Sequence, residues 1–198
     1  MNIVFDLGMV LIEWDPRHVY RKVFSDDARM EWFLSEVCHG NWNLEQDRGR
    51  TWTEAEAEAI ARHPAMAREI RLYRERWHDM VPGAIAGTVA ILEELDARGA
   101  PLYAVTNWAS DTFAETRRRF SFLDRFRDIV VSGDEKIIKP DAAIFELLCR
   151  RNGLEPGDCI FIDDSLKNVK GAEALGWQGH HFSEPTRLRA DLTARGLL

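Results

Sequence analysis

The chain has 198 residues, of which 45% are hydrophobic and 30% charged, and it carries a formal net charge of −7 at pH 7. This composition is typical of a globular protein with a buried core and excludes an intrinsically disordered chain. The negative net charge argues against non-specific binding to nucleic acid. The three cysteines are widely spaced and form no CxxC pair, so we expect neither a disulfide framework nor a zinc site.

The sequence shows no pattern of a membrane or secreted protein. No apolar run approaches the ~20 residues that a membrane-spanning helix needs. No signal-peptide pattern opens the chain, because Asp6 interrupts its first apolar stretch. We therefore expect a cytoplasmic protein that does not bind membranes. Either a monomer or a homodimer is expected.

Four short β-rich runs recur along the chain. They span residues 2–7, 101–107, 128–132 and 158–164. Each run is apolar on both faces, which is typical of strands in a parallel sheet that is covered on both sides. Helical patterns separate the later runs, and two of these helices are expected to stop at Gly99 and Gly153. The alternation predicts an α/β fold, a three-layer Rossmann-like core with a parallel sheet.

Residues 15–80 have a different character, because helical patterns follow one another there without a strand between them. This segment predicts an inserted helical cap domain. The α/β core domain would then consist of residues 1–14 and 81–198. Within the insert, Thr53 and Glu56 have the spacing of a capping box at the start of a helix.

Polar side chains stand at the carboxyl ends of the predicted strands, which is where open parallel sheets bind ligands. In chain order they are Asp6, Thr106 with Asn107, Lys139, and Asp163 with Asp164. Two adjacent acids after an apolar strand repel each other unless a positive group lies between them. Mg²⁺ prefers carboxylate oxygens and commonly also binds a substrate phosphate. The pattern therefore predicts a magnesium and phosphate site at this edge.

These residues also suggest a reaction. Asp6 would be the nucleophile and would form an aspartyl-phosphate that water hydrolyses. The metal ion would neutralise phosphate charge that otherwise repels the attacking carboxylate, and Lys139 would add a second positive charge. Thr106 and the backbone N–H groups at the following helix start would hold phosphate oxygens.

Four motifs in this order resemble those of haloacid dehalogenase superfamily hydrolases with a helical cap after the first strand. The motifs are "DLGMVL" at Asp6, "VTN" at Thr106, "KP" at Lys139 and "FIDDSLKNVKGAEALG" from residue 161. The resemblance implies that the first strand is central. It also implies Mg²⁺ ligands from Asp6, the Gly8 carbonyl, Asp163 and Asp164, without deciding which of the last two binds directly. Implied contacts with the substrate come from Gly8, Met9, Thr106, Asn107 and Lys139. Asn168 and Gly171 are expected to shape the loop and helix behind the acids.

The first motif departs from the family pattern at one position. Phosphatases of this family usually carry a second aspartate two residues after the nucleophile, as general acid and base, and this chain has Gly8 there. General acid catalysis contributes ~10²–10⁴-fold to a rate. The chain is similar to a branch of sugar-phosphate phosphatases that reads "DLGNV" at this place. A water, the substrate or a cap residue would then supply the proton, with Glu45 and Asp47 as the candidates in the insert.

The expected function is therefore Mg²⁺-dependent phosphatase action on a small phosphorylated metabolite, with sugar phosphates as one class of substrate. A 2-haloacid dehalogenase is the first alternative, because a halide leaves without a proton and Gly8 permits that chemistry. Asp163 and Asp164 argue against it, since such enzymes need no metal and the two acids would repel. The second alternative is a weakly catalytic protein that binds a metabolite.

Overall fold

The computed structural model describes residues 1–198 and contains one five-stranded sheet in which all neighbouring strands are parallel. The strands are β1 (Asn2–Phe5), β2 (Leu102–Thr106), β3 (Asp128–Val131), β4 (Cys159–Asp163) and β5 (Gln178–His181). Their order is β3-β2-β1-β4-β5, so β1 is central. Phe5 pairs with Ala104 on one side and with Ile162 on the other. The carboxyl ends of β1, β2 and β4 therefore meet at one edge, as the Rossmann-like prediction requires.

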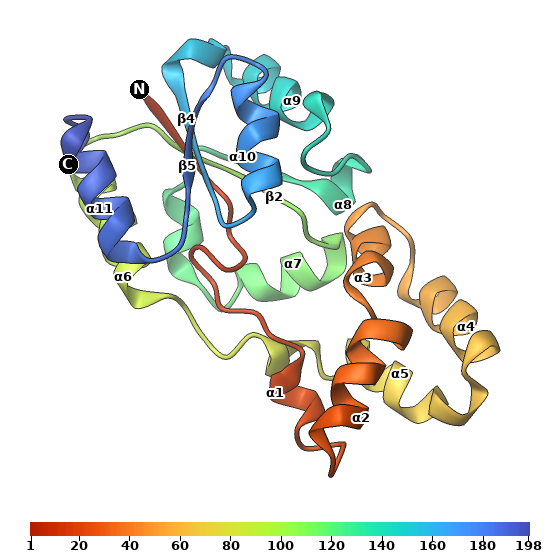
Figure 1. The fold of residues 1–198 in the computed structure, drawn as a ribbon. Helices are drawn as coiled ribbons and strands as arrows, with labels where there is room; N and C mark the ends of the chain where they lie inside the picture. Colours follow the sequence, from red (N-terminus) through yellow and green to blue (C-terminus); the bar gives the residue numbers. More distant parts are fainter.

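Helices cover both faces of the sheet and make the core three layers deep (Figure 1). Successive strand residues point to opposite faces, so Ile3 and Phe5 join one hydrophobic cluster and Val4 joins the other. The first cluster includes side chains of α6 (Ala86–Ala97) and α11 (Pro185–Ala194), and α7 (Ser110–Arg117) also contributes to it. The second cluster includes side chains of α9 (Ala142–Asn152) and α10 (Leu166–Glu173). The fold class predicted from the alternating pattern is confirmed.

The segment after β1 forms a group of short helices beside the carboxyl edge of the sheet (Figure 1). They are α1 (Arg17–Tyr20), α2 (Asp27–Trp32), the π-helix η1 (Phe33–Val37), α3 (Gly40–Asp47), α4 (Trp52–Arg62), η2 (Pro64–Met66), α5 (Ala67–Glu75) and η3 (Trp77–Met80). Aromatic rings of Tyr20, Phe33 and Tyr73 pack together inside this group. No strand interrupts the insert, in agreement with its helical pattern.

The capping box predicted at Thr53 and Glu56 is wrong by two residues. In the structure Thr51 is the N-cap of α4, and its hydroxyl accepts a hydrogen bond from the backbone N–H of Glu54 at 3.3 Å. The Glu54 carboxylate accepts one from the backbone N–H of Thr51 at 3.1 Å. Both pairs have the same spacing, so the spacing alone does not distinguish them; in the structure the first residue of α4, Trp52, is buried.

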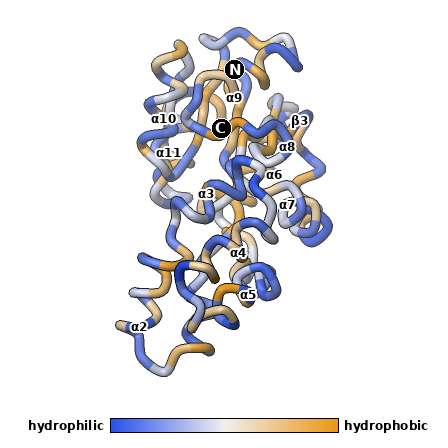
Figure 2. Tube along the Cα trace, turned by 90° about the vertical axis from the view of Figure 1, so that its right-hand side faces the viewer, coloured by the Kyte–Doolittle hydropathy of each residue, from blue (hydrophilic) through white to orange (hydrophobic).

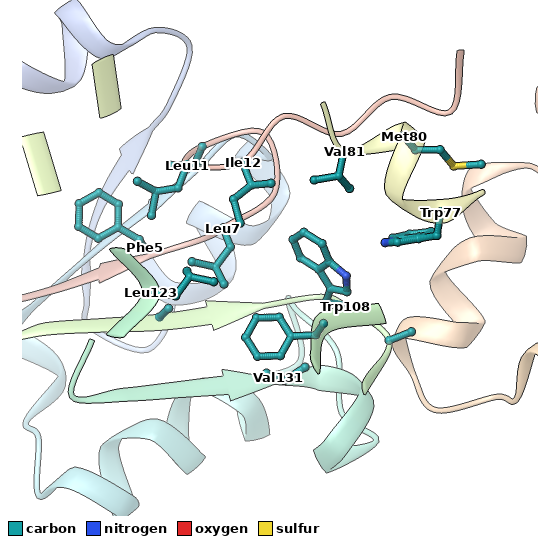
Figure 3. Packing of buried hydrophobic residues seen from close by; sticks show 14 of the residues in the cluster. Phe5, Leu7, Leu11, Ile12, Trp77, Met80, Val81, Trp108, Leu123 and Val131 are labelled. Carbon is teal, nitrogen blue, oxygen red and sulfur yellow. The ribbon is translucent and has the colours of Figure 1, made fainter. Parts of the chain in front are cut away.

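Apolar side chains run from the sheet into the helical insert without a break. Figure 3 shows Leu7 and Ile12 near Trp108, with Leu11 further away beside Phe5. Trp108 lies between these core residues and Trp77 of η3. Figure 2 shows hydrophobic segments near the sheet in the middle of the molecule and hydrophilic segments at many places on its outside. None of the helices combines the length and the apolar composition that crossing a bilayer requires.

Candidate active site

A buried cluster of opposite charges lies at the carboxyl edge of the sheet. Lys139 lies between α9 and the short helix α8 (Ser132–Glu135), and its Nζ lies 2.8 Å from Oδ1 of Asp6 and 2.7 Å from Oδ2 of Asp163. The side chains of Lys139 and Asp163 are 1% and 0% exposed. These residues are far apart in the sequence, and they meet because β1 and β4 are adjacent parallel strands that end at the same edge.

Asp164 completes a group of acids that could hold a metal ion. One carboxylate oxygen from each of Asp6, Asp163 and Asp164 lies within 4.8 Å of the others. When ionised, the three acids and Lys139 carry three negative charges and one positive charge, which leaves two negative charges uncompensated. A divalent cation would balance these charges, and Mg²⁺ prefers such hard oxygen ligands. The donor set therefore fits Mg²⁺.

Burial shifts the protonation equilibria of this cluster. Burial raises the pKa of Asp6 to about 7; Lys139 opposes this shift, while Asp163 and Asp164 add to it. Burial and the neighbouring Asp163 also raise the pKa of Asp164. Burial alone would lower the pKa of Lys139, but the attraction of Asp6 and Asp163 outweighs it and the pKa of Lys139 is raised. The lysine therefore stays charged, while the acids repel one another.

Thr106 and Asn107, at the end of β2, have different surroundings. Thr106 is buried, and its Oγ1 has no hydrogen-bond partner in the chain. Buried polar atoms are normally paired, so this hydroxyl is available to a ligand. The Asn107 side chain instead binds the backbone of Lys139: its Oδ1 accepts from Lys139 N at 2.8 Å, and its Nδ2 donates to Lys139 O at 3.2 Å. Asn107 thus positions the lysine and also borders the cavity described below.

Asn168 and Gly171 of α10 support the acids from behind. Nδ2 of Asn168 lies 3.1 Å from both carboxylate oxygens of Asp163 and orients that side chain. A Cβ atom on Gly171 would lie 2.7 Å from Cβ of Pro140, so glycine allows α10 to approach the loop that carries Lys139. Their place in the last sequence motif was the only signal for these roles.

A cavity of about 150 Å³ lies between the core and the helical insert. It is lined by Gly8, Met9, Trp14, Asn43, Asp47, Trp77, Asn107 and Trp108. Met9 is 42% exposed and adopts a left-handed backbone conformation with φ of 58°, which the turn after β1 requires. Three of the substrate contacts implied by the motifs, Gly8, Met9 and Asn107, therefore border one space. No motif or pattern in the sequence predicted that Trp14, Asn43 and Trp108 would line it with them.

Unpaired polar atoms surround this cavity. The indole Nε1 atoms of Trp14, Trp77 and Trp108, and Oδ1 of Asn43, are buried and have no hydrogen-bond partner in the chain. Trp77 and Trp108 lie across from each other (Figure 3), with ring centroids 6.5 Å apart. Unpaired buried donors cost free energy unless something satisfies them. The cavity is therefore suited to a ligand that has both apolar surface and oxygen acceptors.

The two candidate proton donors of the insert lie in different surroundings. Asp47 is the last residue of α3, is 6% exposed and borders the cavity. Glu45 is more exposed, lies 3.9 Å from Arg48 and borders a separate surface depression. Residues two positions apart on a helix point to different sides, which explains why one faces inward and the other outward. Of the two, the structure brings Asp47 to the site.

A parallel sheet with acids and a lysine at its carboxyl edge, and with helices inserted after the central strand, defines a Rossmann-like α/β enzyme. Residues 3–176 match the model of the haloacid dehalogenase-like hydrolases. The chain belongs to this family, as its four motifs predict.

Individual relatives in the family have different activities. A phosphoglycolate phosphatase of Nitrosospira multiformis is 38% identical over 95 residues, which cover 48% of this chain and 40% of that protein. The (S)-2-haloacid dehalogenase 4A of Burkholderia cepacia is 31% identical over 87 residues, which cover 43% and 37%. The chain thus spans less than half the length of these relatives.

One solved structure shows the same fold over nearly the whole chain. The HAD family enzyme BT-2542 of Bacteroides thetaiotaomicron, in complex with magnesium and inorganic phosphate, superposes with a TM-score of 0.68. The sequences are 23% identical, and the alignment covers 92% of this chain and 93% of that one. At this identity the likeness establishes the shared fold alone.

Proposed function

We propose that the chain is a Mg²⁺-dependent phosphatase that hydrolyses a phosphomonoester of a small metabolite through an aspartyl-phosphate on Asp6. Residues 15–80 act as the cap over the site, and residues 1–14 and 81–198 act as the core. Sugar phosphates are the first class of substrate to test, because indole N–H groups donate hydrogen bonds and sugar hydroxyls accept them.

The proposal rests on the positions of Lys139, Asp163 and Asp164 around Asp6. Nζ of Lys139 lies 2.8 Å from Oδ1 of Asp6, and Asp163 and Asp164 each place a carboxylate oxygen within 4.8 Å of that acid. A nucleophile, a fixed positive charge and a set of oxygen ligands thus lie together. Two likenesses support it: a relative of this chain is a phosphoglycolate phosphatase, and BT-2542 forms a complex with magnesium and inorganic phosphate.

Each of these residues has its own role in the proposed reaction. A carboxylate oxygen of Asp6 attacks phosphorus, and the bond from phosphorus to the leaving alcohol breaks. Lys139 orients Asp6 and offsets negative charge, while the unpaired hydroxyl of Thr106 donates to a phosphate oxygen. Mg²⁺, when bound, supplies the further positive charge that lets an anion approach a phosphate dianion. Water then attacks the aspartyl-phosphate and restores Asp6.

A 2-haloacid dehalogenase is the second candidate, since Gly8 permits it and a dehalogenase is among the relatives. In that reaction a halide leaves without a proton and no metal ion is needed. The cluster of Asp6, Asp163 and Asp164 counts against it, because three acids share one lysine there. Their repulsion costs free energy without a second cation.

A phosphate-release assay over sugar phosphates and other phosphorylated metabolites tests the proposal. We expect turnover in MgCl₂, none in EDTA, and a loss to background in Asp6→Asn with an unchanged circular dichroism spectrum. The matched control is Asp158→Asn, which changes an exposed acid at the opposite end of β4. Halide release from a 2-haloacid without Mg²⁺ would replace the proposal with the dehalogenase. Metabolite binding without turnover of any ester would replace it with a binding protein.

A further inference from the structure

We propose that Asp47, the last residue of cap helix α3, is the general acid that protonates the leaving alcohol, in the place of the aspartate that this chain lacks at Gly8. The inference rests on the proposed phosphatase function. It gives the cap a catalytic group in addition to its role in covering the site.

The core holds Asp47 in place at both its backbone and its side chain. Its carbonyl oxygen accepts a hydrogen bond from Oγ of Ser132 at 2.6 Å. The backbone N–H of Ala109 lies near its carboxylate and acts to lower the pKa of that group. Ser132 follows β3 and Ala109 lies between β2 and α7, so both come from the carboxyl edge that carries Asp6. Although Asp47 belongs to the cap, its carboxyl group is therefore fixed relative to the nucleophile.

Asp47 is also the one ionisable side chain among the residues that line the cavity. The other residues there are tryptophans, asparagines, a methionine and a glycine, none of which has a group that releases a proton near neutral pH. An attack in line by Asp6 leaves the departing oxygen on the far side of phosphorus. The insert contributes Asn43, Asp47 and Trp77 to the lining of the cavity, which also includes Gly8 and Asn107 from the core.

The surroundings of Asp47 suit a group that must hold a proton before the bond breaks. Burial raises the pKa of Asp47 to about 7; the Ala109 N–H and Lys139 oppose this shift, and the charge of Asp6 adds to it. The neutral amide of Asn43, with Nδ2 3.4 Å from Oδ2, contacts the carboxyl group and brings no charge. A general acid works best when its pKa lies near the working pH.

The proton then follows a closed cycle. As Asp6 bonds to phosphorus, the electron pair of the breaking P–O bond goes to the leaving oxygen, and Asp47 gives that oxygen its proton. After the alcohol leaves, the Asp47 carboxylate regains a proton from the solvent, and a water molecule attacks the aspartyl-phosphate. The P–O bond to Asp6 breaks, inorganic phosphate leaves, and both acids return to their starting states.

The substitution Asp47→Asn tests this role with two esters. It keeps the side chain's size and leaves the backbone contact with Ser132. For an alkyl phosphate that the wild type hydrolyses, we expect kcat to fall ~10²–10⁴-fold, the usual contribution of a general acid. For p-nitrophenyl phosphate, whose leaving group departs without a proton, we expect a fall of less than about tenfold. The control Glu45→Gln should change neither rate.

A rescue variant separates a catalytic role from a structural one. A Cβ atom on Gly8 would have its nearest neighbour, Trp108, at 4.0 Å, so an aspartate side chain has room to begin there. We expect Gly8→Asp to restore part of the alkyl phosphate rate of Asp47→Asn, and Gly8→Asn to restore none. If kcat of Asp47→Asn fell by the same factor on both esters, Asp47 would not be the general acid, but the phosphatase function would stand. A wild-type protein inactive on both esters would overturn the phosphatase function as well.

Discussion

Lys139 and Asp163 form an ion pair inside the protein, with Nζ 2.7 Å from Oδ2 and side chains that are 1% and 0% exposed. The same Nζ contacts Asp6 at 2.8 Å, so one ammonium serves two acids. Removing one member of a buried pair leaves its partner charged and without compensation, which is far more costly than losing a surface pair. The lysine is therefore expected to stabilise the fold as well as to act in the reaction.

We predict that Lys139→Met lowers the free energy of unfolding by roughly 3–5 kcal/mol at neutral pH, the usual effect of breaking a buried ion pair. MgCl₂ should restore part of this loss, because a cation bound by Asp163 and Asp164 replaces some of the missing positive charge. Urea unfolding with and without MgCl₂ measures both effects. The control Lys170→Met removes an exposed lysine of α10 and should change little. A Lys139→Met protein as stable as the wild type would contradict the prediction.

The acids of the cluster could be predicted from the sequence because they stand at strand ends, whereas Lys139, in the loop before α9, was indicated by its KP motif. In a parallel sheet the carboxyl ends of adjacent strands share one edge, so the apolar runs before Asp6, Thr106 and Asp163 were sufficient to bring these residues together. To place these residues together, it was enough to know which strands are neighbours in the sheet. The same pattern predicted the parallel α/β fold, and the family match confirms it.

The insert could not be predicted to the same depth. Residues 40–47 have no strong helical periodicity, yet they form α3, where Trp42 is buried and Nε1 of Trp42 donates to Ala55 O at 3.2 Å. Tertiary contacts thus outweigh weak local propensity. The cavity depends on how this helix sits against the core, and that position follows from long-range contacts such as Ser132 with Asp47. The unpaired indole groups therefore had no signal in the sequence.

The unpaired indole of Trp77 gives a second prediction. Trp77→Phe removes a buried N–H that has no partner in the chain, so stability should fall only through the void that the smaller ring leaves. The KM for a substrate held by that N–H should rise. Trp52→Phe is the matched comparison, because Nε1 of Trp52 donates to Oδ1 of Asp111 at 3.1 Å. It should show a similar packing loss and, in addition, lose about 1 kcal/mol for the hydrogen bond, with KM unchanged. Urea unfolding and steady-state kinetics measure the two effects. Equal behaviour of both variants would show that the Trp77 N–H does not face the substrate.

Asp47 gives a prediction about stability and pH that is independent of turnover. Its pKa is about 7 in the folded protein, against 3.8 for an ordinary aspartate. Between these values the unfolded chain binds fewer protons at this site than the folded protein, so the contribution of Asp47 to stability is lost as the pH rises from 4 to 7. Asp47→Asn cannot ionise and avoids this loss. The variant should therefore match the wild type near pH 4 and exceed its stability by up to about 4 kcal/mol above pH 7.

Urea unfolding of both proteins at several pH values between 4 and 8 measures this difference. Asp6 and Lys139, the charged groups that act on Asp47, are present in both proteins, so their own contributions largely cancel in the comparison. Asp158→Asn removes an exposed acid and should give a difference from the wild type that stays flat over the same range. A flat difference for Asp47→Asn as well would mean that its carboxyl group ionises as it does in water. If Asp47→Asn both raises stability and lowers alkyl phosphatase activity, then Asp47 destabilises the fold of the wild type. Such a cost is expected of a residue kept for function rather than for structure.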